Sequence, residues 1–156
     1  MKLTATFAIL GSAALSMVAA QTGSFTNFTN IATAPTQFTA TSVSLSPVPL
    51  CVQKTCLTLI GNLSTPITQG ARNSVTGRWL DRLVYTDTQD LCAVLAANGT
   101  PCPIAAGAIT LNVCHPMRSM TPRNFPIIYQ YIITNGDGGL LLAQRANTSL
   151  SAKDCP

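Results

Sequence analysis

The residues of this chain with the clearest chemistry are its six cysteines. An even number of cysteines is typical of a disulfide framework in an oxidising compartment, although several connectivities stay open. Local spacing favours the bridges Cys51–Cys56 and Cys92–Cys102, which leave Cys114 to pair with Cys155.

Cysteine side chains can also bind a metal ion or act as reactive thiols. The spacings contain no paired C-x-x-C motif, and His115 is the single histidine. Structural zinc sites combine four Cys and His ligands, usually in such motifs, and thiols oxidised to disulfides supply no nucleophile. We therefore expect no metal, no cofactor and no catalytic cysteine.

Three aspartates, Asp81, Asp87 and Asp90, lie close enough in sequence to suggest the paired carboxylates of a hydrolase acting on wall polysaccharide,. Their setting argues against this. We interpret the Thr-Asp-Thr-Gln-Asp segment that holds Asp87 and Asp90 as a turn, and Asp81 as a solvated strand residue. The chain has no glutamate and no G-x-S-x-G motif,. The sequence therefore predicts a protein that is not an enzyme.

The first twenty residues predict the compartment. Lys2 is followed by an apolar run from Thr6 to Val18, with small residues before Gln21. This is the pattern of a signal peptide over 1–20, cleaved after Ala20, and the run is too short to span a membrane comfortably. We expect a soluble mature protein that is secreted, or delivered to the lumen of the endomembrane or vacuolar system.

The rest of the chain is predicted to form one domain. Residues 21–36 are polar and Thr-rich, and they are interpreted as a flexible N-terminal arm or an irregular first strand,. Residues 37–156 then supply one domain's length. The net charge is +4, and the basic residues are scattered, whereas nucleic-acid binders concentrate them,. We expect no nucleic-acid partner, while a weak attraction to anionic membranes is permitted.

Glycosylation sequons are spread along the chain. Asn98 is favoured as an acceptor, because a disulfide-closed loop next to Gly99 is expected on the surface. The four sequon asparagines are Asn27, Asn62, Asn98 and Asn147.

Short alternating runs predict strands throughout. From Thr39 to Leu45 apolar and polar residues alternate until Pro47 and Pro49, and residues 51–56 are expected to form a stapled hairpin,. Residues 108–114 alternate most regularly, and residues 127–133 are apolar on both faces, as in a central strand. A Gly-rich turn at 135–139 predicts a hairpin with residues 140–146. Many short strands in one domain indicate an antiparallel β-sandwich.

Several of these motifs together resemble the MD-2-related lipid-recognition (ML) family, which includes Niemann-Pick C2 sterol carriers and fungal phosphatidylglycerol/phosphatidylinositol transfer proteins. The resemblance covers residues 39–146 and depends on the order of five motifs. They are Ser46-Pro47 before Cys51 and Cys56, Val75-Thr76-Gly77 leading to Leu91-Cys92, Cys102-Pro103-Ile104 with Gly107, Phe125-Pro126-Ile127-Ile128-Tyr129, and Asn135-Gly136-Asp137-Gly138.

The resemblance implies an all-β, immunoglobulin-like antiparallel sandwich with disulfides and an apolar cavity between its sheets. The chain departs from the family's pattern in one respect. Family members usually join a cysteine near the mature N-terminus to one on the last strand, and both are missing here. A Cys114–Cys155 bridge would then be a replacement that ties the C-terminal tail to a central strand.

The implied function is a monomeric carrier that holds a sterol or phospholipid and transfers it during transient membrane contact. Burial of ligand hydrocarbon, at about 25 cal/mol per Å², would drive binding without an acid or base. Family positions near the pocket mouth correspond to Phe125, Pro126 and Ile128, with Met117 on the adjoining loop. Ordinary core packing explains each lining candidate equally well. Further wall candidates are Leu83, Tyr85, Leu111, Val113 and Ile132.

Two questions stay open from the sequence. Met117 and Met120 could form a lid over a binding site or could fill gaps in the core. Arg118 and Arg123 could bind the phosphate of a lipid headgroup or could simply face solvent. A secreted adhesion or effector-like protein is the alternative function. It would have a packed core and an exposed apolar patch, whereas a carrier needs room in its interior.

Overall fold

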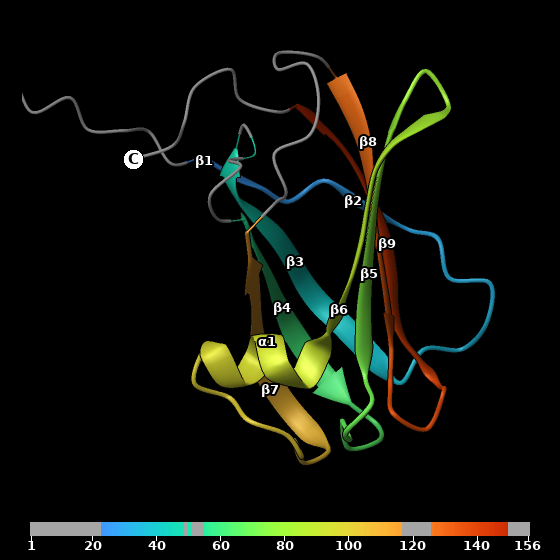
Figure 1. Cartoon of the computed structure of the whole chain (residues 1–156). Helices are drawn as coiled ribbons and strands as arrows, with labels where there is room; N and C mark the ends of the chain where they lie inside the picture. Colours follow the sequence, from blue (N-terminus) through green and yellow to red (C-terminus); the bar gives the residue numbers. More distant parts are fainter. Residues whose placement is uncertain (1–22, 49, 51–54, 117–125, 150–156) are drawn as a thin grey trace, which may run out of the picture.

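The computed structural model describes residues 23–48, 50, 55–116 and 126–149. Two antiparallel sheets face each other across one apolar core (Figure 1). The first sheet contains, in spatial order, β1 (Gly23–Phe25), β3 (Phe38–Val48), β4 (Thr55–Leu63) and β7 (Gly107–His115). The second contains β2 (Phe28–Asn30), β9 (Leu140–Ser149), β8 (Pro126–Thr134), β5 (Arg72–Trp79) and β6 (Arg82–Asp90). The predicted all-β, immunoglobulin-like sandwich is confirmed.

The N-terminal segment contributes to both sheets. β1 pairs with β3, Gly23 lying opposite Val48, and β2 pairs with β9, Phe28 lying opposite Ala146. These strands fall within the segment that was expected to be an arm or an irregular first strand. The expected signal peptide lies outside the described residues.

A bulge changes which face of β3 is buried. Ala40 pairs with Gly61 and Ser42 with Ile60, so Thr41 is an extra residue in the ladder. Phe38 is buried before the bulge and Leu45 after it, because one inserted residue exchanges the two faces of a strand,. The predicted simple alternation from Thr39 to Leu45 is therefore wrong. The predicted end at the prolines is confirmed, because β3 ends at Val48, between Pro47 and Pro49.

Strand pairing overturns two of the expected disulfides. β4 pairs with β7 so that Cys56 lies directly opposite Cys114, and these two residues form a bridge. Cys56 therefore does not pair with Cys51, nor Cys114 with Cys155. Spacing along the chain misled the prediction, because the sheet brings together cysteines that are 58 residues apart. Cys51 and Cys155 lie outside the described residues.

The expected loop between Cys92 and Cys102 contains a helix instead. The bridge itself is present as predicted, and it ties α1 (Leu91–Ala97) to the following segment. Asp90 caps the helix by accepting a hydrogen bond from the Ala93 amide at 2.9 Å,. The buried side chains of Leu91 and Leu95 place α1 against the core where it contacts β6 and β7.

No helix in the described part of the chain has the length and apolar character of a membrane span.

The predicted hairpin between β8 and β9 is confirmed. The Asn135 amide donates to the Gly139 carbonyl at 2.8 Å, and Gly138 adopts a left-handed φ of 85°. The buried Asn135 side chain accepts from the Thr68 amide at 3.0 Å and donates to the Pro66 carbonyl at 2.9 Å. This turn therefore fastens the connection between β4 and β5 to the end of the second sheet.

Candidate functional site

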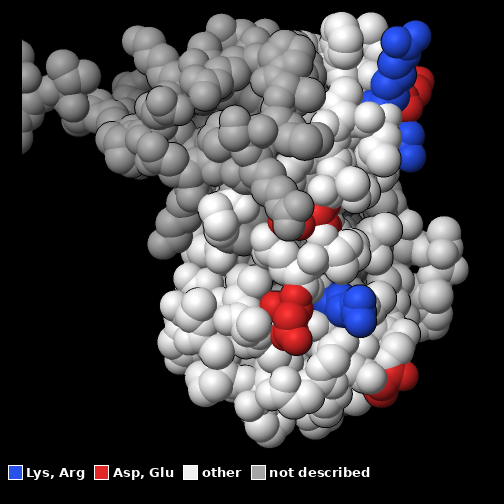
Figure 2. Space-filling model, viewed as in Figure 1, with Lys and Arg blue, Asp and Glu red and all other residues white. Residues whose placement is uncertain are grey.

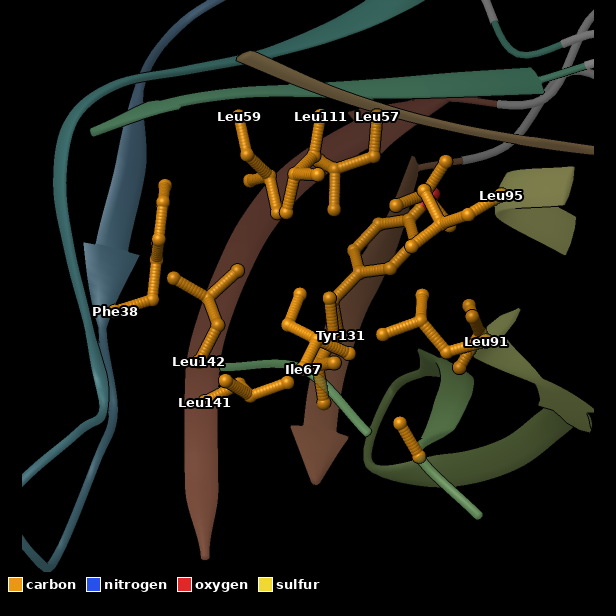
Figure 3. Packing of buried hydrophobic residues seen from close by; sticks show 14 of the residues in the cluster. Phe38, Leu57, Leu59, Ile67, Leu91, Leu95, Leu111, Tyr131, Leu141 and Leu142 are labelled. Atoms are coloured by element: carbon orange, nitrogen blue, oxygen red, sulfur yellow. The ribbon is translucent and has the colours of Figure 1, made fainter. Parts of the chain in front are cut away.

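The space between the sheets is lined by large apolar side chains. In Figure 3, Leu57, Leu59 and Leu111 extend from the first sheet toward Tyr131 and Leu142 of the second. A void of about 10 Å³ remains among them, and every residue that lines it is apolar. Those residues are Phe38, Leu59, Leu63, Ile67, Leu91, Leu111, Val113, Ile133, Leu141 and Leu142.

A larger groove opens beside this void. It measures about 330 Å³ and lies between the start of β3 and the β2–β9 edge of the second sheet. Its lining mixes threonines with Phe28, Ala40 and Val43. Phe38 and Leu142 line both the groove and the void, so these two side chains form the partition between them.

Gly61 leaves room for the tip of the Phe38 ring beside β4. A Cβ atom at Gly61 would come within 2.7 Å of the tip of that ring and would also meet the backbone of β3. The bulge and this glycine together position the Phe38 side chain at the edge of the core. Sequence reasoning missed Phe38, because simple alternation placed it on the opposite face from Leu45.

The inner face of the second sheet carries polar groups as well. Asn73 on β5 is fully buried, and neither atom of its side-chain amide has a hydrogen-bond partner among the described residues. Gln89 lies directly opposite on β6 and donates to Asp87 at 2.7 Å. An unpaired buried amide lowers the stability of the fold by roughly 1 to 3 kcal/mol. Stability therefore does not explain why an asparagine occupies position 73.

Tyrosines continue this polar strip along the sheet. Tyr85 and Tyr129 flank Gly77 on the two neighbouring strands, and their rings stack with centroids 6.0 Å apart. Tyr131 meets Tyr129 edge to face at 5.4 Å. Burial raises the pKa of Tyr129 and Tyr131, and the nearby tyrosines raise it further. The interior thus has an aliphatic wall on the first sheet and a wall with hydrogen-bonding groups on the second.

The predicted lining residues are distributed between the inside and the outside. Leu111 and Val113 line the void, and Tyr85 is buried on the inner face of the second sheet. Leu83 and Ile132 are exposed.

The family positions near the pocket mouth are only partly described. Pro126 is exposed and Ile128 is half-buried. Phe125 and Met117 lie outside the described residues, as do Met120, Arg118 and Arg123.

The aspartates that could suggest a hydrolase have separate roles. Asp81 lies in the β5–β6 turn, Asp87 accepts a hydrogen bond from Gln89, and Asp90 caps α1. The predicted turn at Asp87 and Asp90 is wrong, because β6 runs through both, and Asp81 is not a strand residue. Within the described ranges no three His, Cys, Asp or Glu side chains gather as metal ligands.

The sequon asparagines differ in accessibility. Asn27, Asn62 and Asn147 are exposed. Asn98 is half-buried, and its side-chain amide donates to the Val94 carbonyl at 2.7 Å and to the Cys114 carbonyl at 3.3 Å. The amide that a glycan would modify is therefore engaged at the end of α1.

Two antiparallel sheets around an apolar core, with an adjoining groove, define a β-sandwich. The ML domain family model matches residues 32–136, about two thirds of the sequence, and the chain belongs to this family. A solved Niemann-Pick type C2 protein from the Japanese carpenter ant has the same fold. It matches with a TM-score of 0.51 and 13% identity, over 65% of this chain and 76% of that one. No curated protein matches the sequence.

Proposed function

We propose that this protein is a secreted or lumenal carrier that holds a sterol or phospholipid between its sheets and transfers it between membranes. The observation that carries the proposal is the partition formed by Phe38 and Leu142 between the groove and the apolar void. Displacement of the Phe38 ring would join the two spaces. Ligand sites typically measure about 300 to 1,000 Å³, and the groove alone, at about 330 Å³, reaches that range,.

The driving force is burial of ligand hydrocarbon. Leu59, Leu111 and Val113 supply an aliphatic surface on the first sheet. Each square ångström of hydrocarbon removed from water contributes about 25 cal/mol, less the cost of immobilising the ligand. Such a site needs no acid or base, in agreement with the separate structural roles of the aspartates.

The polar strip supports a ligand with a small hydrogen-bonding group. Asn73 faces the interior with an amide that has no partner among the described residues, and the tyrosine rings lie farther along the same face. A sterol hydroxyl or a glycerol ester would offer that amide a partner inside the sandwich. The proposal also includes three further properties of the protein: it is exported by the leader at 1–20, it contacts membranes transiently, and it is a monomer.

Mass spectrometry of the purified protein tests the proposal directly. The mature chain would be purified from a eukaryotic secretion host and extracted with organic solvent, alongside an unrelated secreted protein. A sterol or phospholipid near one molecule per chain supports the carrier and names its ligand class. Without enriched lipid, and without uptake from offered sterol or phospholipid vesicles, the proposal fails.

Phe38→Leu tests the partition. A smaller side chain lowers the barrier between groove and void, so the rate of sterol uptake should rise several-fold, measured with a fluorescent sterol by stopped flow. Leu57→Val is the matched control, because Leu57 is equally buried but lines neither space. Equal uptake rates in the two variants would place the entrance elsewhere.

A secreted adhesion or effector-like protein without a lipid cavity is the alternative. Two observations favour it: the apolar void between the sheets measures only about 10 Å³, and the β5–β6 hairpin exposes large apolar side chains. Failure of both lipid extraction and lipid uptake would select this alternative.

A further inference from the structure

The outer face of the first sheet is uncharged. None of its strands, β1, β3, β4 and β7, contains Lys, Arg, Asp or Glu. β4 alternates regularly, so Thr58, Ile60 and Asn62 point outward between buried leucines and Gly61,. The positions beside them on β3 and β7 carry short side chains. In register, these are Thr39 and Ala108 beside Asn62, Ser42 and Thr110 beside Ile60, and Ser44 and Asn112 beside Thr58.

The described charges all belong to the other sheet. Each described Arg or Asp lies on β5, β6 or β9, or in a turn that joins strands of the second sheet. In Figure 2 the blue and red side chains lie over the second sheet and where β6 meets α1. Charged side chains on exposed sheet surfaces oppose association between molecules. The first sheet therefore lacks the usual protection of an exposed sheet.

One large apolar side chain lies on this uncharged face. Ile60 is 44% exposed, because Ser42 and Thr110 beside it are too short to cover it. The other large apolar side chains that are exposed in the described part of the chain lie on the second sheet or in its β5–β6 turn. Contact with a second molecule through the first sheet would bury the Ile60 side chain.

Asn62 lies next to this apolar side chain. It begins the sequon Asn62-Leu63-Ser64 and is two residues from Ile60 on the same face, which separates them by about 7 Å along a strand,. The Asn62 side chain is exposed and makes no hydrogen bond to another described residue, whereas the Asn98 amide is engaged at the end of α1. A glycan on Asn62 therefore requires no change in the fold and extends over Ile60.

We propose that Asn62 carries an N-linked glycan, which covers the uncharged face around Ile60 and keeps two copies of the protein from associating through it. Glycans attached to Asn-X-Ser/Thr sequons are bulky and solubilising. The inference rests on the export included in the proposed function, since such sequons are modified in secreted proteins. The glycan also supplies a physical cause for the proposed monomeric state.

Peptide mass spectrometry of the secreted protein, produced with its own leader in a eukaryotic host, tests the site. Asn62 should carry a glycan in most molecules. Treatment of the folded protein with peptide N-glycosidase should then raise the fraction of oligomer several-fold, measured by sedimentation velocity at constant protein concentration. Because the enzyme acts on protein that has already folded, this result is independent of any effect of the glycan on folding.

Asn62→Gln should associate in the same way, and Asn147→Gln is the matched control. Asn147 is exposed on β9, two residues from the exposed Arg145, so its face keeps a charge without a glycan. Asn147→Gln should therefore stay monomeric. Adding Ile60→Lys to Asn62→Gln should restore the monomer, because a charge replaces the exposed apolar side chain.

A bare Asn62 in the secreted protein would overturn the proposal. So would a protein that stays monomeric after its glycans are removed, or equal association of Asn62→Gln and Asn147→Gln.

Failure of this inference is distinguishable from failure of the carrier function. Secreted protein that binds lipid while Asn62 is bare would keep the carrier and remove the glycan. Protein that carries the glycan on Asn62 but takes up neither sterol nor phospholipid would do the reverse. Retention inside the cell with every sequon bare would contradict export, and with it both proposals.

Discussion

Asn73 is the residue whose position the fold explains least. Its amide is fully buried on the inner face of β5, opposite Gln89, and has no hydrogen-bond partner among the described residues. Buried polar groups are normally paired, and those left unpaired often mark a ligand contact. This makes Asn73 the best candidate for contacting a polar atom of the lipid that we propose as ligand.

Replacing Asn73 with leucine should separate stability from recognition. Leu has a similar volume and needs no partner, so the free energy of unfolding should increase by about 1 kcal/mol, measured by urea denaturation. Affinity for a sterol should fall, because the sterol hydroxyl loses the Asn73 amide as its hydrogen-bond partner.

The same sterol without its hydroxyl is the control ligand. Wild-type protein should prefer the hydroxylated form, and Asn73→Leu should bind the two forms alike. A variant that keeps the wild-type preference would place the polar contact on another residue.

At the scale of elements, the pairing of β4 with β7 sets the covalent framework. The Cys56–Cys114 bridge spans 58 residues, whereas Cys92–Cys102 spans 10. In the chain-entropy account, a longer closed loop gives a larger stabilisation, typically about 2 to 4 kcal/mol for one bridge. Replacing Cys56 and Cys114 together with serine should therefore lower the melting temperature more than replacing Cys92 and Cys102. The opposite order, measured by calorimetry, would contradict this account.

Sequence patterns predicted most strands but fewer of the site residues. Regular alternation identified β7 correctly, with Leu111 and Val113 inward, and glycines marked the β8–β9 turn. The bulge in β3 was hidden, because one extra residue leaves composition unchanged while it exchanges the faces. Because the bulge was not predicted, Phe38 was not predicted as a site residue either.

The turn between β5 and β6 is a second feature that the sequence pattern did not predict. By residue type, Trp79, Leu80 and Leu83 all suit strands, since apolar side chains usually mark buried strands. Trp79 ends β5 and Leu83 lies in β6, as strand residues, but positive φ places Leu80 in the turn between them. All three side chains are exposed. Asp81 suits a turn by residue type but Leu80 does not, so the backbone conformation is what identifies the turn,.

At the scale of the whole molecule, the tyrosines report on separation of the two sheets. The chain has three, Tyr85, Tyr129 and Tyr131, and all are buried on the inner face of the second sheet. Burial raises the pKa of Tyr129 and Tyr131 above the usual value of about 10,. Their contribution to stability is therefore complete below pH 10 and is lost as the pH rises, because only the unfolded chain ionises there.

Alkaline titration should consequently proceed as one cooperative event. The tyrosinate absorbance of Tyr129 and Tyr131 should be absent from the native protein as the pH passes 10, and should then appear together with loss of the sheet signal in circular dichroism. Lipid held between the sheets binds the folded state alone, so the lipid-loaded protein should unfold at higher pH than the lipid-free protein. Gradual ionisation of Tyr129 and Tyr131 near pH 10, with the sheets intact, would mean that solvent already reaches the interior. The same unfolding pH with and without bound lipid would mean that the ligand lies outside the sandwich.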